Sequence, residues 1–222
     1  MTLSPEINSF ETNQLERSLR GVQQEVLRMG TLVEQSFRLS HQVLFERDID
    51  AVGKIDRIEK HIDIYYRQIE SKCATLMTLQ APVAQDLRLL SALMQLVRDL
   101  ERIGDYAQDL GEMGIKLMKY PPHKILPEIA LMSEHAQLML ATSLVALADL
   151  DFSAGKRVKE LDDIVDDAYD RLYNTIAFET DIPGVVEPIL ILALILRHLE
   201  RMADHATNIG QRVTYIVTGK RN

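Results

Sequence analysis

The chain has 222 residues, of which 46% are hydrophobic and 26% charged, a balance that provides a buried core and excludes a disordered protein. Its net charge of −8 disfavours general binding to nucleic acid, because that affinity comes mainly from neutralising phosphates. The single cysteine, Cys73, excludes a disulfide framework and a cysteine-rich zinc site. The longest aliphatic run, Ile189 to Leu196, is too short to span a bilayer, and the polar start has no signal-peptide pattern. We therefore expect a cytoplasmic protein.

Helix-forming residues fill the stretches between the prolines, and no sustained apolar–polar alternation predicts a strand. Apolar residues recur every three or four positions, from Leu15 to Val33 near the start and from Leu199 to Ile216 near the end. Stripes of this kind belong to long helices packed at shallow angles. The pattern predicts an all-α protein with six long helices, near residues 11–46, 50–79, 83–118, 128–149, 153–178 and 186–217.

The second half of the sequence repeats the first. The segment Arg-Asp-Leu-Glu-Arg-Ile-Gly-Asp that begins at Arg98 recurs 99 residues later, as Arg-His-Leu-Glu-Arg-Met-Ala-Asp from Arg197. Earlier in each half the offset is 103 residues, as between Asp63 and Asp166, and a loop before the third helix absorbs the difference. Matches in register over such a length indicate a duplication. We predict two tandem three-helix bundles, residues 1–120 and 121–222, separated at Pro121-Pro122.

Acidic residues are paired at i and i+4 on the second and third helices of each half. At 100° per residue these pairs point away from the apolar stripes, and on antiparallel neighbours they can face each other. Like charges at this spacing destabilise a helix by roughly 0.2–0.5 kcal/mol, so a bound hard cation such as Mg²⁺ or Ca²⁺, or iron or manganese, is one explanation. The candidate metal ligands, which include two residues that continue the rows, are Glu59, Asp63, Glu101, Asp105, Asp109, Asp162, Asp166, Glu200, Asp204 and Asn208.

A charged row is also what a solvated helix face carries. Arginines adjoin the pairs on the third helix of each half and can neutralise them without a metal, so spacing alone leaves both interpretations open. We expect His198 and His205, which lie beside these pairs, to face solvent. Catalytic motifs are missing: the sequence has no glycine-rich phosphate loop, no Gly-x-Ser-x-Gly, no His-Glu-x-x-His, and no Glu-x-x-His of the ferritin-like di-metal enzymes.

Two segments resemble the duplicated signature of the PhoU family, accessory proteins of phosphate-specific transport: Leu-Glu-Arg-Ile-Gly-Asp-Tyr-Ala from Leu100 and Leu-Glu-Arg-Met-Ala-Asp-His-Ala from Leu199. The segment from Ala81 to Arg88 resembles the Pro-x-Ala-x-Asp-Leu-Arg of that family, and the second half lacks it. The resemblance extends from about residue 15 to 217. Glu59 stands where the family usually has Asp, and Asp109 where Asn is common.

The resemblance implies paired three-helix bundles whose acidic faces bind a divalent or multinuclear metal, such as iron, zinc, manganese or magnesium. It also implies a non-enzymatic, negative regulator in the cytoplasm. Such a protein sits at the inner membrane face through protein contacts and couples the subunits of the phosphate ABC transporter to a sensor histidine kinase; a homodimer is left open. The alternatives are a carboxylate-bridged metal enzyme, a metal-storage helical bundle, and a purely structural helical adaptor.

Overall fold

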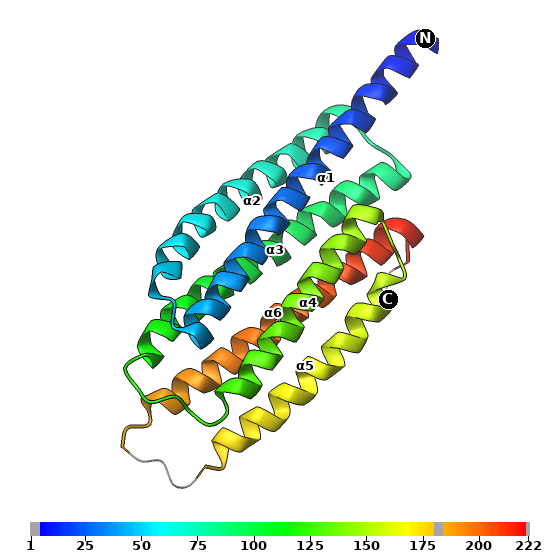
Figure 1. Ribbon diagram of the computed structural model, residues 1–222. Coiled ribbons are helices and arrows are strands. Elements are labelled where there is room, and N and C mark those ends of the chain that lie inside the picture. Colours follow the sequence, from blue (N-terminus) through cyan, green and yellow to red (C-terminus); the bar gives the residue numbers. More distant parts are fainter. Residues whose placement is uncertain (1–4, 180–183, 221–222) are drawn as a thin grey trace.

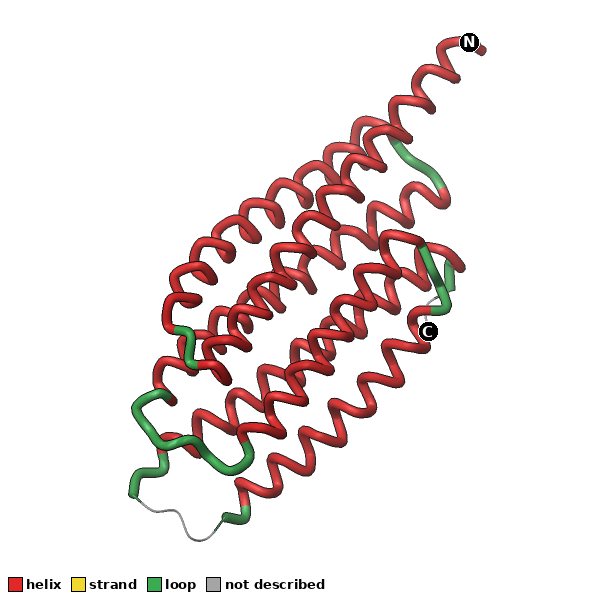
Figure 2. Tube along the Cα trace, viewed as in Figure 1, coloured by secondary structure: helices red, strands yellow, loops and turns green. Residues whose placement is uncertain are grey.

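The computed structural model describes residues 5–179 and 184–220, and every regular element in this part of the chain is a helix (Figure 2). The first half holds α1 (Pro5–His41), α2 (Val52–Gln80) and α3 (Ala84–Leu117). The second half holds α4 (Leu126–Asp149), α5 (Ala154–Ala177) and α6 (Glu187–Thr218). The prediction of an all-α protein with six long helices is confirmed. The boundaries differ clearly only in the first helix: α1 begins at Pro5 rather than near residue 11 and ends at His41, with a π-helical turn over the remaining residues to 46.

The duplication is visible at the first corner of each half. Arg47 and Leu150, which are 103 residues apart, both take the left-handed conformation, with φ of 61° and 51°. The next residue in each case is an aspartate whose carboxylate accepts a backbone N–H two positions later, at 3.0 Å for Asp48 and 2.9 Å for Asp151. In the first half, a π-helical turn, η1 (Gln42–Glu46), and a short 3₁₀ helix, η2 (Ile49–Ala51), flank this corner.

The two three-helix bundles lie side by side with their helices roughly aligned, as Figure 1 shows. Across the boundary α3 contacts α6 and α1 contacts α4, and the buried side chains of both halves form one connected core. Gly30 of α1 permits this approach, because a Cβ there would come within 2.5 Å of Leu144 on α4. The break falls where the sequence predicts it, with α3 ending at Leu117 and α4 beginning at Leu126. Division into two domains, 1–120 and 121–222, stays a prediction.

One helix in the described part of the chain, α4, is long and apolar enough to cross a membrane by length and composition. Half of its most apolar window is buried against the rest of the bundle, and the core helix of a globular protein passes the same test. The apolar run that opens α6 is also split between two environments. Ile191 and Leu192 are buried, whereas Leu190 and Leu194 are exposed.

Candidate functional site

The first acidic patch consists of Glu59 and Asp63 on α2 with Glu101 and Asp105 on α3. These two helices pack against each other along the first bundle, and all four side chains are only partly exposed. Burial, and then the nearby charge of Asp63 and Asp105, raises the pKa of Glu59 above its usual value. Burial also raises the pKa of Glu101 and of Asp105, and the charge of Asp63 adds to both shifts. The expectation that the two pairs face each other is confirmed.

The second acidic patch, on α5 and α6, consists of Asp162, Asp166, Glu200 and Asp204. Burial raises the pKa of Asp166, with further contributions from Asp162 and Asp204. Burial likewise raises the pKa of Glu200, with contributions from Asp204 and Asp166. Asp162 is only 6% exposed, and its Oδ1 has no hydrogen-bond partner within the described residues. This buried, unpaired carboxylate oxygen has no counterpart in the first patch.

Basic side chains already contact these carboxylates. The arginine that follows each patch glutamate on α3 and α6 turns to the aspartate three residues later: Arg102 lies 3.3 Å from Asp105, and Arg201 lies 2.8 Å from Asp204. On α5, Lys159 donates to Asp162 at 2.9 Å. In these rotamers no three His, Cys, Asp or Glu side chains among residues 5–179 and 184–220 converge closely enough to hold a metal ion.

The chemistry of both patches nevertheless fits a hard divalent cation. Carboxylate oxygens are the ligands that such ions prefer, and a bound cation would offset both the burial that chiefly raises these pKa values and the mutual repulsion that adds to it. The Oδ1 of Asp162, which has no hydrogen-bond partner among the described residues, is available as a metal ligand in the second patch. Metal binding would require the side chains to turn from their basic partners toward one another. The metal role of the ten predicted ligands therefore stays a prediction.

Two of the predicted ligands lie apart from the patches, where α3 packs against α6. We call this contact between the two halves the seam. Asp109 of α3 contacts His198 of α6, with 3.1 Å between Oδ2 and Nε2. Asn208 of α6 reaches Asp99 of α3, with 3.5 Å between Nδ2 and Oδ1. These contacts are equivalent by the duplication, because residues 109 and 208, and likewise 99 and 198, are 99 apart. Asp109 still acts on the first patch through its charge, which contributes to the raised pKa of Asp105.

Sequence reasoning missed the centre of this seam, the buried carboxylate of Asp99. It accepts from Arg212 at 2.8 Å and lies 2.9 Å from Nδ1 of His205. The expectation that His198 and His205 face solvent is wrong, because their side chains are only 15% and 13% exposed. The covering surface comes from the opposite bundle, which a reading of one helix at a time does not include.

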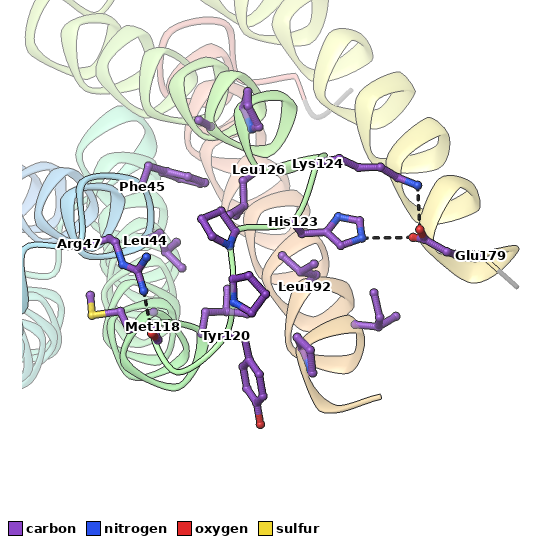
Figure 3. Close-up of a pocket in the computed structure, with 18 of the residues that line it drawn as sticks. Leu44, Phe45, Arg47, Met118, Tyr120, His123, Lys124, Leu126, Glu179 and Leu192 are labelled. Atoms are coloured by element: carbon purple, nitrogen blue, oxygen red, sulfur yellow. Dashed lines mark hydrogen bonds and ion pairs between the residues drawn. The ribbon is translucent and has the colours of Figure 1, made fainter. Parts of the chain in front are cut away.

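An apolar cavity of about 850 Å³ lies at the end of the bundles where the 118–125 linker passes between α3 and α4 (Figure 3). Its wall includes Leu44, Leu126 and Leu192, which come from both halves. On its rim, His123 and Lys124 both point to Glu179, with contacts of 3.2 Å and 2.7 Å (Figure 3). The hydrogen bond from Lys124 is the main reason that the pKa of Glu179 is lowered. The cavity shares no residue with either acidic patch.

The PhoU domain matches this chain twice, over residues 26–113 and 129–213, which are the two halves of the duplication. The chain belongs to the PhoU family. Each PhoU repeat contains one complete acidic patch, with the second helix of that half and most of the third. This match confirms the family that the two signature segments, from Leu100 and from Leu199, predict.

Named PhoU proteins match over nearly their whole length. A phosphate-specific transport system accessory protein PhoU homolog from Synechocystis sp. is 66% identical and is aligned over 99% of this chain and 98% of its own. The homolog from Deinococcus radiodurans is 31% identical, over 93% and 98%. The crystal structure of PhoU from Pseudomonas aeruginosa superposes with a TM-score of 0.88 at 29% identity, covering 92% of this chain and 99% of that one. These names describe accessory proteins of phosphate transport, a family of regulators.

Proposed function

We propose that this protein is a non-enzymatic, cytoplasmic regulator that binds divalent metal at its two acidic patches and couples the phosphate ABC transporter to a sensor histidine kinase. The family assignment supports a regulatory role in phosphate transport. The observation that carries the metal part is the buried, unpaired Oδ1 of Asp162 among carboxylates whose pKa values are raised.

The mixed charge of the patches supports a signalling surface. Glu101 and Glu200 each lie beside an arginine, at 3.7 Å from Arg102 and 2.7 Å from Arg197. A divalent ion, when bound, supplies positive charge to a carboxylate cluster, so the same surface would present arginines without their counter-charges. A kinase domain or transporter subunit that docks by charge complementarity would distinguish these two states. The net charge of −8 gives no general attraction to anionic lipid, so contact with the membrane would go through such proteins.

The test is a double substitution, Glu101→Gln with Glu200→Gln, in cells grown with ample phosphate. Both side chains lie off the buried stripes, so we expect a folded protein at normal abundance. We expect loss of restraint on the phosphate-starvation response, measured as alkaline phosphatase activity. A matched control, Glu112→Gln with Glu134→Gln, removes the same charge from exposed positions outside the patches and should leave alkaline phosphatase repressed. Full repression in both strains would show that the patches carry no signal.

A further inference from the structure

The seam between α3 and α6 contains a second site of opposite charge to the acidic patches. A cavity of about 430 Å³ opens there, with four guanidinium groups on its wall, from Arg98, Arg102, Arg201 and Arg212. The one carboxylate in this wall is that of Asp99. Because Arg212 and His205 already contact Asp99, its charge is largely neutralised before any ligand arrives. The basic cavity therefore has a net positive wall inside a protein of net charge −8.

The wall of the basic cavity includes two pairs of residues that the duplication makes equivalent. Arg102 and Arg201 are 99 residues apart and so are equivalent by the duplication, and the same holds for Tyr106 and His205. All four line this one cavity, and the two rings are 6.0 Å apart between centroids. The duplication thus places two equivalent arginines at one point, so the chain has one such site rather than two.

We propose that the basic cavity binds a phosphoryl anion, for which inorganic phosphate is the simplest probe. Guanidinium groups recognise phosphate through paired, charge-assisted hydrogen bonds, and several around one concave wall suit a dianion better than a single carboxylate. Arg98 makes no hydrogen bond or ion pair in the described part of the chain, and its charge acts on Glu101 only at longer range. Arg102 and Arg201 are shared with Asp105 and Asp204, so the anion would compete with the acidic patches for them.

The first experiment is calorimetric titration of the full chain, without metal, with inorganic phosphate. We expect one phosphate per chain, and about tenfold weaker binding by Arg98→Gln, which removes a charge-assisted contact. Arg197→Gln is the matched control: residue 197 is the duplication equivalent of 98, it lies outside the cavity and it pairs with Glu200. The control should change the affinity less than twofold. No binding, two phosphates per chain, or equal losses in the two variants would overturn the proposal.

Competitors identify the source of the anion. Tripolyphosphate and ATP carry the same phosphoryl charge, so equal displacement of phosphate points to free phosphate species, whereas tighter binding of ATP points to a nucleotide. Both outcomes support a phosphoryl site. An oligoglutamate peptide that displaces phosphate more effectively than tripolyphosphate would instead assign the basic cavity to an acidic protein partner and overturn the proposal.

A second variant tests the competition between sites and does not depend on metal binding. Asp105→Asn with Asp204→Asn removes the carboxylates that hold Arg102 and Arg201, so we expect phosphate to bind severalfold more tightly. Asp167→Asn with Asp170→Asn removes the same charge from exposed positions on α5 and should have less than half that effect. Equal gains from the two double substitutions would show that only overall charge matters. Because no metal is present, failure here is separate from failure of the proposed metal regulation.

Discussion

The two acidic patches occupy equivalent places in the two halves, yet the basic side chains that pair with them on α2 and α5 differ. In the first patch, Asp63 pairs with Arg67 at 2.7 Å, one turn further along α2. The position equivalent to Arg67 in the second half is Asp170, so Asp166 has no such partner on that side. On α5 the basic partner is instead Lys159, which contacts Asp162 and stands where the first half has Asp56.

The difference teaches that the duplication preserved the paired carboxylates and changed the residues around them. In the first patch all four carboxylates are partly exposed, so solvent screens their charges. The second patch combines a buried Asp162 with a run of further aspartates on α5, and its one lysine also contacts Asp163. If either patch depends on a bound cation, the second depends on it more. The predictions below test this asymmetry, together with the asymmetry of the seam between the halves.

The largest effect is expected at the seam, where the two ends are equivalent by the duplication but unequally buried. Asp99→Asn should lower the free energy of unfolding by about 2 kcal/mol, because a buried carboxylate with several charged or polar partners loses its charge. Asp109→Asn should cost less than about 1 kcal/mol, since that carboxylate is half exposed and contacts only His198 among the described residues. Denaturant unfolding measures both. Equal costs would contradict the view that Asp99 is the centre of the seam.

The periodicity of the sequence was sufficient to predict the six helices, their duplication and the facing of the acidic pairs. These features depend on contacts within one bundle, where the apolar stripe of each helix determines which side faces inward. Glu101 lies off the stripe of Leu100 and Ile103, and the structure places it there.

The seam could not be predicted in the same way. Asp99 and His205 lie on flanks of their helices that would be open to water if each bundle stood alone. They become buried because α3 and α6 pack against each other, and the angle of that packing is not contained in the pattern of either half. The basic cavity depends on the same packing, because its arginines come from both helices. Its one signal in the sequence is that Arg102 and Arg201 are equivalent by the duplication.

A smaller effect should separate the patches in protein free of metal. Asp162→Asn with Asp166→Asn should raise the free energy of unfolding by about 1 kcal/mol, because it removes two repelling carboxylates, one of them buried with an unpaired oxygen, while Lys159 loses Asp162 but keeps its ion pair with Asp163. For a chain of this length that corresponds to a rise in Tm of about 2–4 °C. Glu59→Gln with Asp63→Asn should change little, because it also removes the ion pair with Arg67.

The gain in Tm on addition of metal also distinguishes the two patches. Wild-type protein should gain Tm on addition of Mn²⁺ or Mg²⁺, since any ligand bound only by the native state stabilises it. Asp162→Asn with Asp166→Asn, in the second patch, should lose more of this gain in Tm than Glu59→Gln with Asp63→Asn, in the first. If Asp162→Asn with Asp166→Asn melts below wild type without metal and still gains as much from metal, the second patch is not the stronger site.

The smallest effect is expected from mild acidification of the metal-free protein. The five patch carboxylates with raised pKa values are Glu59, Glu101, Asp105, Asp166 and Glu200, in each case chiefly because of burial. Such groups take up protons in the native state before they do so in the unfolded state. Lowering the pH from 7 towards 5 should therefore raise the free energy of unfolding, and this gain is lost again as the pH rises through the native pKa values.

Groups with lowered pKa values act in the opposite direction, but mostly outside this window. The pKa of Asp151 is lowered to about 2 by hydrogen bonds from Ser153 and Arg157, so its stabilisation is lost only below about pH 4. Within the window the opposing group is His41, whose pKa is lowered by burial. Thermal melts at pH 7, 6 and 5 should show a rising Tm in wild type and a smaller rise in the Glu101→Gln, Glu200→Gln protein. A wild-type Tm that falls over this range, with the same fall in the variant, would mean that protonation of the patch carboxylates does not stabilise the native protein.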